Sequence, residues 1–175
     1  MAGLDTESVQ AHLAGLRRYA RALTRDDAAA DDIVQDALVR AIERSDTFRP
    51  GASLRAWLAS IVHNVFVSTR RREAAEARRD EAFADLRPAA PDGGDQEHAA
   101  QLASVADGFH ALPEAQRAVL HLVAVEGLSY QEAAAALDVP IGTIMSRLSR
   151  ARAALRAPAK VRVPALRIVG GNQDE

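Results

Sequence analysis

The feature that most constrains the fold is a helix-break-helix pattern near the C-terminus, SYQEAAAALDVPIGTIMSRLSRARAALR, residues 129–156. Ser129 and Glu132 have the S-x-x-E spacing of a capping box, which marks the start of a short helix. The tripeptide Asp-Val-Pro at 138–140 interrupts that helix, and a longer one is predicted to follow as far as about Ala157. Two helices joined by so short a turn predict a helix-turn-helix, whose second helix can enter the major groove of DNA.

The second of these predicted helices has two different faces. Its core face is spaced 4, 3 and 4 residues apart, at Ile144, Leu148, Ala151 and Leu155. A separate polar and basic face carries Thr143, Arg147 and Arg150, flanked by Ser146 and Arg152. The chain has no acidic residue from 139 to 173 but seven basic ones. Because arginine pairs bidentately with guanine, these residue types favour base reading over a generic basic surface helix.

Composition divides the rest of the chain into two parts. A further helix is predicted over residues 112–127, with Pro113 in its first turn and Gly127 after its end. Before it, RPAAPDGGDQEH combines prolines, glycines and alternating charge, which break helices and bury little. We therefore expect an all-α protein of two small helical domains joined by a flexible linker, with boundaries 1–86 for the first domain, 87–98 for the linker, 99–157 for the second domain and 158–175 for a tail.

The clearest helix of the first part is ADDIVQDALVRAIER, residues 30–44. Its helically spaced apolar face predicts a core contribution from Ala30, Ile33, Val34, Ala37, Leu38, Ala41 and Ile42. The opposite face carries Asp32, Gln35, Asp36 and Glu43, with Val39 among them. Periodicity alone favours a solvated charged face there and leaves a partner-binding surface as the alternative.

A second long helix is predicted over residues 53–72, with Ser53 as a plausible N-cap. It ends in the three arginines Arg70, Arg71 and Arg72, and Arg78 and Arg79 follow closely. Cations favour a helix C-terminus on dipole grounds alone. Together with Phe48, Trp57 and Phe66, so many arginines would also suit a groove that holds a nucleic-acid backbone and stacks unpaired bases. Trp57 lies on the apolar face of the helix, a position more typical of the core.

The sequence offers no candidate for bond chemistry. There is no cysteine, and the five histidines have no metal-ligand spacing. We therefore expect no catalytic residue, no metal and no cofactor, and thus no enzyme. No apolar run approaches the roughly 20 residues of a membrane span, and MAGLDTESVQ lacks the order of a signal peptide. A cytoplasmic protein without membrane insertion is expected.

The segment LPEAQRAVLHLVAVEGLSYQEAAAALDVPIGTIMSRLSRARAAL closely resembles the C-terminal promoter-binding domain of bacterial extracytoplasmic-function (ECF) sigma factors. In that family E-G-x-S-Y-x-E-A-A followed by G-T-[VI]-x-S-R-[LV]-x-R-A-R is specific. The first part resembles the family too, through DDIVQDALVRA and FRPGASLRAWLASIVHNVF. The resemblance covers about residues 8–157 and implies a sigma factor that directs core RNA polymerase to promoters, usually under the control of an anti-sigma protein.

The resemblance also implies roles for individual residues. The helix that docks on the clamp coiled coil of RNA polymerase matches Asp32, Gln35, Asp36 and Val39. The part that reads and opens the minus-10 promoter element matches Trp57, His63, Asn64, Ser68, Arg70, Arg71 and Arg72. The helix that reads the minus-35 element matches Thr143, Ser146, Arg147, Arg150 and Arg152. This chain departs from many members at Met145, where they have Lys, and around residues 62–64 and 68–69.

Two other functions remain as alternatives. Some response regulators carry a sigma-like module that titrates an anti-sigma protein without binding DNA. Arg147 and Arg150, together with the absence of a receiver domain from these 175 residues, disfavour that decoy. A plain helix-turn-helix repressor would leave the resemblance of the first part unexplained.

Overall fold

The computed structural model describes residues 6–49, 51–79 and 106–156, and every regular element in these ranges is a helix. The first two ranges form an N-terminal unit with α1 (Thr6–Thr24), α2 (Asp27–Glu43), the short 3-10 helix η1 (Ser45–Thr47) and α3 (Leu54–Arg79). The third forms a C-terminal unit with α5 (Glu114–Leu120), the π-helical turn η2 (His121–Val125), α6 (Tyr130–Leu137) and α7 (Ile141–Arg156). The prediction of an all-α fold is confirmed. The predicted linker 87–98 and tail 158–175 lie outside the described residues.

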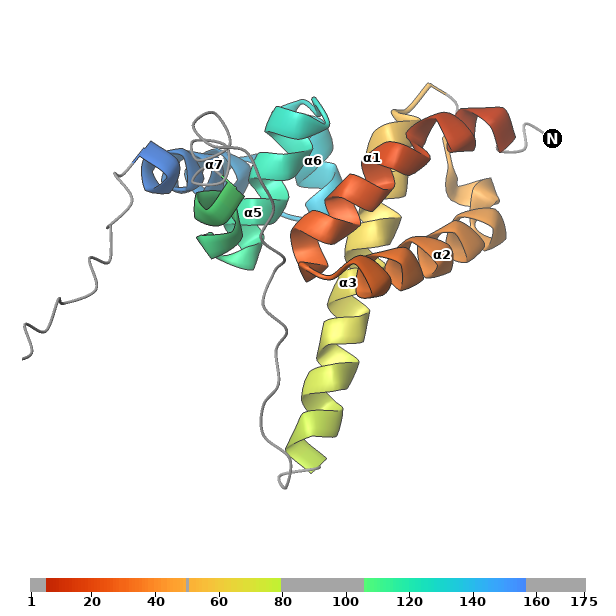
Figure 1. Ribbon diagram of the computed structural model, residues 1–175. Coiled ribbons are helices and arrows are strands. Elements are labelled where there is room, and N and C mark those ends of the chain that lie inside the picture. Colours follow the sequence, from red (N-terminus) through yellow and green to blue (C-terminus); the bar gives the residue numbers. More distant parts are fainter. Residues whose placement is uncertain (1–5, 50, 80–105, 157–175) are drawn as a thin grey trace, which may run out of the picture.

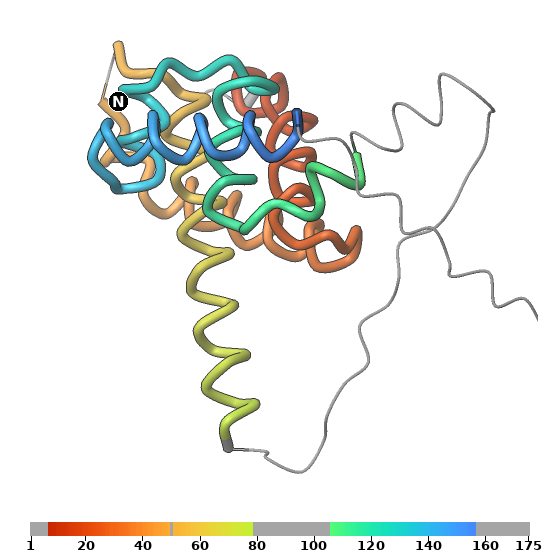
Figure 2. Tube along the Cα trace, turned by 90° about the vertical axis from the view of Figure 1, so that its left-hand side faces the viewer, coloured from red at the N-terminus to blue at the C-terminus, as the bar shows by residue number. Residues whose placement is uncertain are grey.

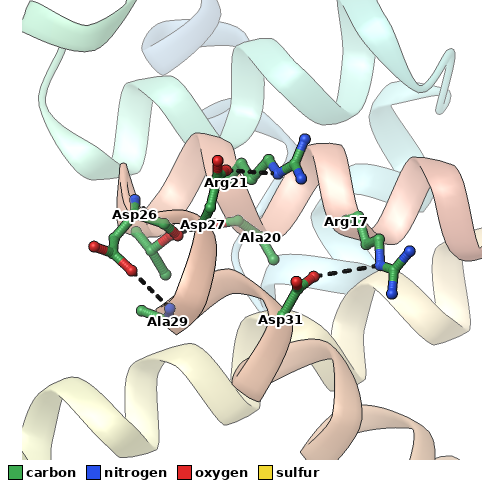
Figure 3. Close-up of polar contacts among 8 residues, drawn as sticks. Arg17, Ala20, Arg21, Asp26, Asp27, Ala29 and Asp31 are labelled. Carbon is green, nitrogen blue, oxygen red and sulfur yellow. Dashed lines mark hydrogen bonds and ion pairs between the residues drawn. The ribbon is translucent and has the colours of Figure 1, made fainter. Parts of the chain in front are cut away.

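Helices α1 and α2 form an antiparallel pair that packs on α3 (Figure 1). Asp26 caps α2, because its Oδ1 accepts a hydrogen bond of 2.7 Å from the backbone N–H of Ala29. Two ion pairs then tie the helices together on their exposed side, with Arg21 Nε 2.8 Å from Asp27 Oδ1 and Arg17 Nε 3.3 Å from Asp31 Oδ1 (Figure 3). Exposed pairs of this kind contribute little to stability, so the buried apolar face holds the pair together.

Helix α3 is the longest element and has two different halves. Its first half is buried against α1 and α2 through side chains such as Leu58, Val62 and Phe66. Its second half projects away from both units (Figures 1 and 2), and the side chains of residues 71–78 are exposed. The helix therefore presents its arginine-rich end to solvent, seven residues beyond the predicted end at 72.

The C-terminal unit is a helix-turn-helix with the predicted caps. Ser129 and Glu132 form both hydrogen bonds of the capping box, at 3.2 and 2.8 Å. Asp138 ends α6 in the left-handed conformation, with φ of 50°, which turns the chain into α7. The core face of α7 is buried as predicted at Ile144, Leu148 and Ala151. In Figure 2, α7 runs crosswise to α3.

The two units are packed against each other. Helix α1 contacts α5 and η2, and α3 contacts α6. As a result, buried side chains of both units, from Leu16 and Val62 to Leu122 and Ile144, belong to a single hydrophobic core. No sequence pattern predicted this arrangement, because the contacts join residues far apart in the chain.

Two local results differ from expectation. Ile42 was predicted to be in the core, but it is 73% exposed, so this prediction is wrong. It lies in the last turn of α2, one residue before the helix ends at Glu43. Helix α1 was not predicted as a separate element, although Leu16, Ala20 and Leu23 follow helical spacing. No helix in the described part of the chain is long and apolar enough to cross a membrane.

Candidate nucleic-acid interface

All five residues predicted to read the minus-35 element lie on α7. Arg150 and Arg152 are exposed, whereas Thr143, Ser146 and Arg147 are half-buried. The Ser146 hydroxyl donates a hydrogen bond of 3.1 Å to the backbone carbonyl of Thr143, so its oxygen remains an acceptor. The helix follows a turn and presents its first residues at the surface, with Met145 54% exposed. Such a helix can supply two arginines and an apolar side chain to a major groove.

Arg147 faces the other unit. Its positive charge is close enough to His63 of α3 to contribute to lowering the pKa of His63 to about 4, although burial is the larger cause. His63 is half-buried, and its Nδ1 lies 3.1 Å from the hydroxyl of buried Tyr19. One residue predicted for the minus-35 element therefore lies close to one predicted for the minus-10 element.

The other residues predicted for the minus-10 element are spread along α3. Trp57 is half-buried, packs on the core and has its ring centroid 5.4 Å from that of Phe48. Asn64 and Ser68 are exposed on the following turns, and Ser68 Oγ donates 2.8 Å to the carbonyl of Val65. The geometry favours the core role of Trp57 that its position on the apolar face already indicated.

A groove brings the arginines of α3 together with the acidic face of α2. It has a volume of about 1060 Å³ and is lined by α2, by α3 and by the start of α5. Asp32, Asp36, Arg70 and Arg72 all line it. Arg70 also pairs with Glu73 at 3.3 Å, one turn further along α3. The structure thus places predicted polymerase-binding and predicted DNA-binding side chains in one groove.

The predicted polymerase-binding face of α2 is open to solvent. Asp32, Gln35 and Asp36 are exposed, and Val39 is 55% exposed. Together with exposed Ile42 they form a mixed acidic and apolar surface. Such a surface is typical of a protein-binding site, since isolated solvated faces seldom expose neighbouring aliphatic side chains.

Sequence reasoning missed three polar residues that the structure buries. Arg117, His121 and Glu126 are 4, 5 and 8% exposed, and all lie where the C-terminal unit meets α1. Arg117 could have been noticed, because it is the one Lys or Arg between 99 and 138 and directly precedes the apolar residues 118–120. Nothing local to the sequence identifies its partners. Within the described ranges no cluster of side chains could hold a metal ion.

Comparison with protein families matches each unit separately. The model described as the Sigma2 domain of PhyR matches residues 9–63. The model described as Sigma-70, region 4, matches residues 105–155. The first match covers α1, α2 and the start of α3, and the second covers the whole helix-turn-helix.

Individual relatives span most of the chain. The ECF RNA polymerase sigma factor EcfG of Rhodopseudomonas palustris is 38% identical over 154 residues, which are 86% of this chain and 82% of that protein. SigM of Mycobacterium tuberculosis, also an ECF RNA polymerase sigma factor, is 34% identical over 166 residues, with the same two shares.

Among solved structures, the sigma factor RpoE of Bartonella quintana, in complex with the anti-sigma factor NepR, superposes with a TM-score of 0.74. It is 33% identical, and the match covers 89% of this chain and 96% of that one. The helical arrangement therefore has a close counterpart in a sigma factor held by its inhibitor.

Proposed function

Because the chain belongs to the ECF sigma factors of bacterial RNA polymerase, we propose that it binds core polymerase, directs it to specific promoters and initiates transcription there. The observation that carries the proposal is that the matched relatives extend over both units, including the acidic face of α2 and the basic helix α7. The family acts in transcription rather than as enzymes, and bond formation belongs to the polymerase.

The two units have separate tasks in this proposal. Residues 1–86 bind polymerase and act on the minus-10 element, residues 99–157 read the minus-35 element, and 87–98 link the two. Residues 158–175 have no assigned task. The match boundaries near residues 9–63 and 105–155 support this division.

The minus-35 element is read by α7 as duplex DNA. Arg150 and Arg152 are exposed and can reach base edges or phosphates without any movement of the N-terminal unit. Arg147 and Thr143 are half-buried and become fully available when the N-terminal unit moves away. Because several arginines approach phosphates, promoter binding should weaken steeply as salt rises.

The minus-10 element is read and opened by α3. The exposed side chains of Asn64, Ser68, Arg71 and Arg72 line the helix surface that a separated strand would follow. Extruding a base costs a few kcal/mol, which contacts to the strand must offset. His63 and Trp57 support that surface from below, since both are half-buried.

Core polymerase binds the face formed by Asp32, Gln35, Asp36 and Val39. Exposed carboxylates accompanied by an exposed aliphatic side chain fit a basic and apolar helical partner. An anti-sigma protein is expected to control access to these surfaces, as the complex of the similar sigma factor RpoE with the anti-sigma factor NepR suggests.

The proposal is tested by run-off transcription with bacterial core polymerase and a library of promoter fragments, with and without the protein. Transcripts that start at defined sites only when the protein is added are the expected result. The same assay with Arg150→Ala supplies the matched control, because it should lose promoter selection and keep polymerase binding.

A decoy that binds an anti-sigma protein without binding DNA is the second candidate. The observation that favours it is the match of residues 9–63 to the Sigma2 domain of PhyR, a protein described in a solved complex as an anti-anti-sigma factor. That structure is only 18% identical and supports the fold alone. Tight binding of an anti-sigma protein without transcript formation would favour the decoy.

A further inference from the structure

The contact between the two units contains an unusual concentration of buried charge. Among the described residues, the buried polar or charged side chains are Arg117, His121 and Glu126. All three come from α5, η2 or the residue that follows, and all face α1. Burying a charge is costly unless it is paired, so their partners show what this face is built to contact.

Arg117 binds the end of a helix in the other unit. Its Nε donates a hydrogen bond to the carbonyl of Ala22, and its Nη2 donates one of 3.2 Å to the carbonyl of Leu23. These carbonyls belong to the last turn of α1, where helix carbonyls have no partner within the helix. The positive charge of the guanidinium there also interacts favourably with the negative end of the helix dipole. Arg117 therefore completes α1 from across the unit boundary.

Glu126 forms the second contact, toward the middle of α1. Its Oε1 lies 3.1 Å from Arg18 Nη2 of the other unit and 3.3 Å from His121 Nε2 of its own. Its backbone carbonyl also accepts a hydrogen bond from Arg55 at the start of α3. Glu126 thus contacts both α1 and α3, and these two contacts fix the position of its unit relative to the N-terminal unit.

The surface of α1 is shaped to receive this carboxylate. A Cβ atom at Gly15 would lie 2.5 Å from Oε2 of Glu126, so the carboxylate at the end of that side chain would have to move. Tyr19, one turn further along, stacks on His121 with ring centroids 5.5 Å apart. Gly15 leaves space for the carboxylate, Arg18 pairs with it, and Tyr19 packs beside it.

This closed arrangement conflicts with promoter binding, a step that rests on the proposed function. Elements centred near minus 10 and minus 35 are about 25 base pairs apart, or roughly 85 Å along B-form DNA at about 3.4 Å per base pair. In the structure α3, which acts on the first element, packs directly on α6 of the unit that reads the second. The closed chain cannot reach both elements at once.

Closure also brings the C-terminal unit next to the polymerase-binding face. Asp32, Gln35 and Asp36 line a groove that is also lined by Leu112, Pro113 and Glu114 of the C-terminal unit. The start of α5 is held beside α2 by the contacts of Arg117. A helical partner that seats on the acidic face therefore competes with the position of α5.

We propose that the face formed by Arg117, His121 and Glu126 is a docking surface for the chain's own N-terminal unit, and that docking there holds the free protein in a closed state that cannot engage a promoter. The ion pair between the units joins buried Glu126 to Arg18, whose side chain is 54% exposed, so the contact specifies one arrangement without making it permanent. A partner that binds only the open state then shifts the population toward it.

The test measures the distance between the units in the full-length protein. The chain has no cysteine, so Ala28→Cys in α2 and Ala135→Cys in α6, both exposed, place two fluorophores specifically. Single-molecule energy transfer should show the free wild type mainly in one high-transfer state. Glu126→Ala should raise the ratio of low-transfer to high-transfer molecules by on the order of tenfold, and Gly15→Ala, which displaces the carboxylate without removing it, should raise the ratio by less.

A double-mutant cycle distinguishes loss of the contact between Glu126 and α1 from a general loss of packing. If Gly15→Ala acts by displacing the carboxylate, it should have little further effect when Glu126 is already Ala. Arg21→Ala is the matched control, because it removes an exposed ion pair inside the N-terminal unit and should leave the distances unchanged. Circular dichroism of each variant checks that both units remain folded. This check is essential if Arg117 is also replaced, because Arg117 donates a hydrogen bond to the carbonyl of Leu112 within its own unit.

Unchanged energy transfer in both Glu126→Ala and Gly15→Ala, with folding intact, would overturn the proposal. Fully additive effects in the cycle would also contradict it, because the two residues would then act independently. The measurement uses neither polymerase nor DNA. If both the wild type and the opened variants fail in run-off transcription, that result would count against the proposed sigma function. It would not contradict the docking of the two units.

Discussion

Acid should destabilise this protein through His63, and the size of the effect follows from its surroundings. Burial, helped by the nearby charge of Arg147, lowers the pKa of His63 from 6.5 to about 4. In the neutral imidazole Nδ1 can accept the hydrogen of the Tyr19 hydroxyl, 3.1 Å away, but in the protonated ring it cannot. The folded state therefore binds the His63 proton less readily than the unfolded state does.

The sign follows by linkage. Well above pH 6.5 His63 is neutral in both states, and its contribution to stability is complete. As the pH falls toward 4, the unfolded state gains a proton that the folded state does not, so the free energy of unfolding decreases. Between pH 7.5 and pH 5 the loss through this residue is about 2 kcal/mol.

The assay is urea denaturation followed by circular dichroism at pH 7.5 and pH 5, for wild type and His63→Gln. Gln at 63 keeps a hydrogen-bond acceptor but cannot titrate, so the variant should lose about 2 kcal/mol less than the wild type over this range. His110→Gln is the comparison, since that side chain is exposed and its pKa is also lowered, by partial burial and by Arg25 and Arg117, so this variant should reduce the pH dependence less than His63→Gln does. His121 also has a pKa lowered by burial and remains in every variant. An identical pH dependence in wild type and His63→Gln would refute the reasoning.

Three further outcomes test the proposed surfaces and the helix-turn-helix. Replacing Arg147 and Arg150 with Ala should abolish promoter selection, because each lost base contact costs about 1–3 kcal/mol of binding free energy. Polymerase binding should stay intact in a pull-down, and its loss would mean that the units are assigned wrongly. Reversing the charge at Asp32 and Asp36 should weaken polymerase binding without a large fall in melting temperature, because both are exposed; a large fall would show a structural role. Ser129→Ala should lower the free energy of unfolding by about 1 kcal/mol in calorimetry, and no change would show that the capping box is dispensable.

Sequence patterns predicted those parts of the fold that depend on neighbours in the chain. The capping box at Ser129 and Glu132, the break at Asp138 and the core face of α7 each need only a few adjacent residues, and all are confirmed. Ile42 shows the limit of the same reasoning. Its spacing matches the buried face of α2, but whether the last turn is covered depends on what packs there, and among the described residues Ile42 stays 73% exposed.

The contact between the units could not be predicted from local patterns. Arg117 and Ala22 are 95 positions apart, and Arg18 and Glu126 are 108 apart. No periodicity links such distant positions, and a charged residue in a helix ordinarily indicates an exposed face. The residue assignments for polymerase and promoter binding come from family resemblance and stay predictions, although the exposure of Asp36 and Arg150 is compatible with them.

The π-helical turn η2 makes this contact sensitive to a change in length of the chain. Its backbone hydrogen bond runs from the N–H of Glu126 to the carbonyl of His121, five residues back, at 3.0 Å. An α-helix closes over four residues, and each residue advances it by about 100°. Deleting the exposed Ala124 would restore α-helical spacing and keep Glu126 beside His121, because residues four apart lie on one face of an α-helix. Inserting one residue there would instead turn Glu126 by about 100°, away from His121 and from Arg18 of α1. The gain of a single codon, with no change in the charge of the interface, would thus be enough to remove this contact between the units.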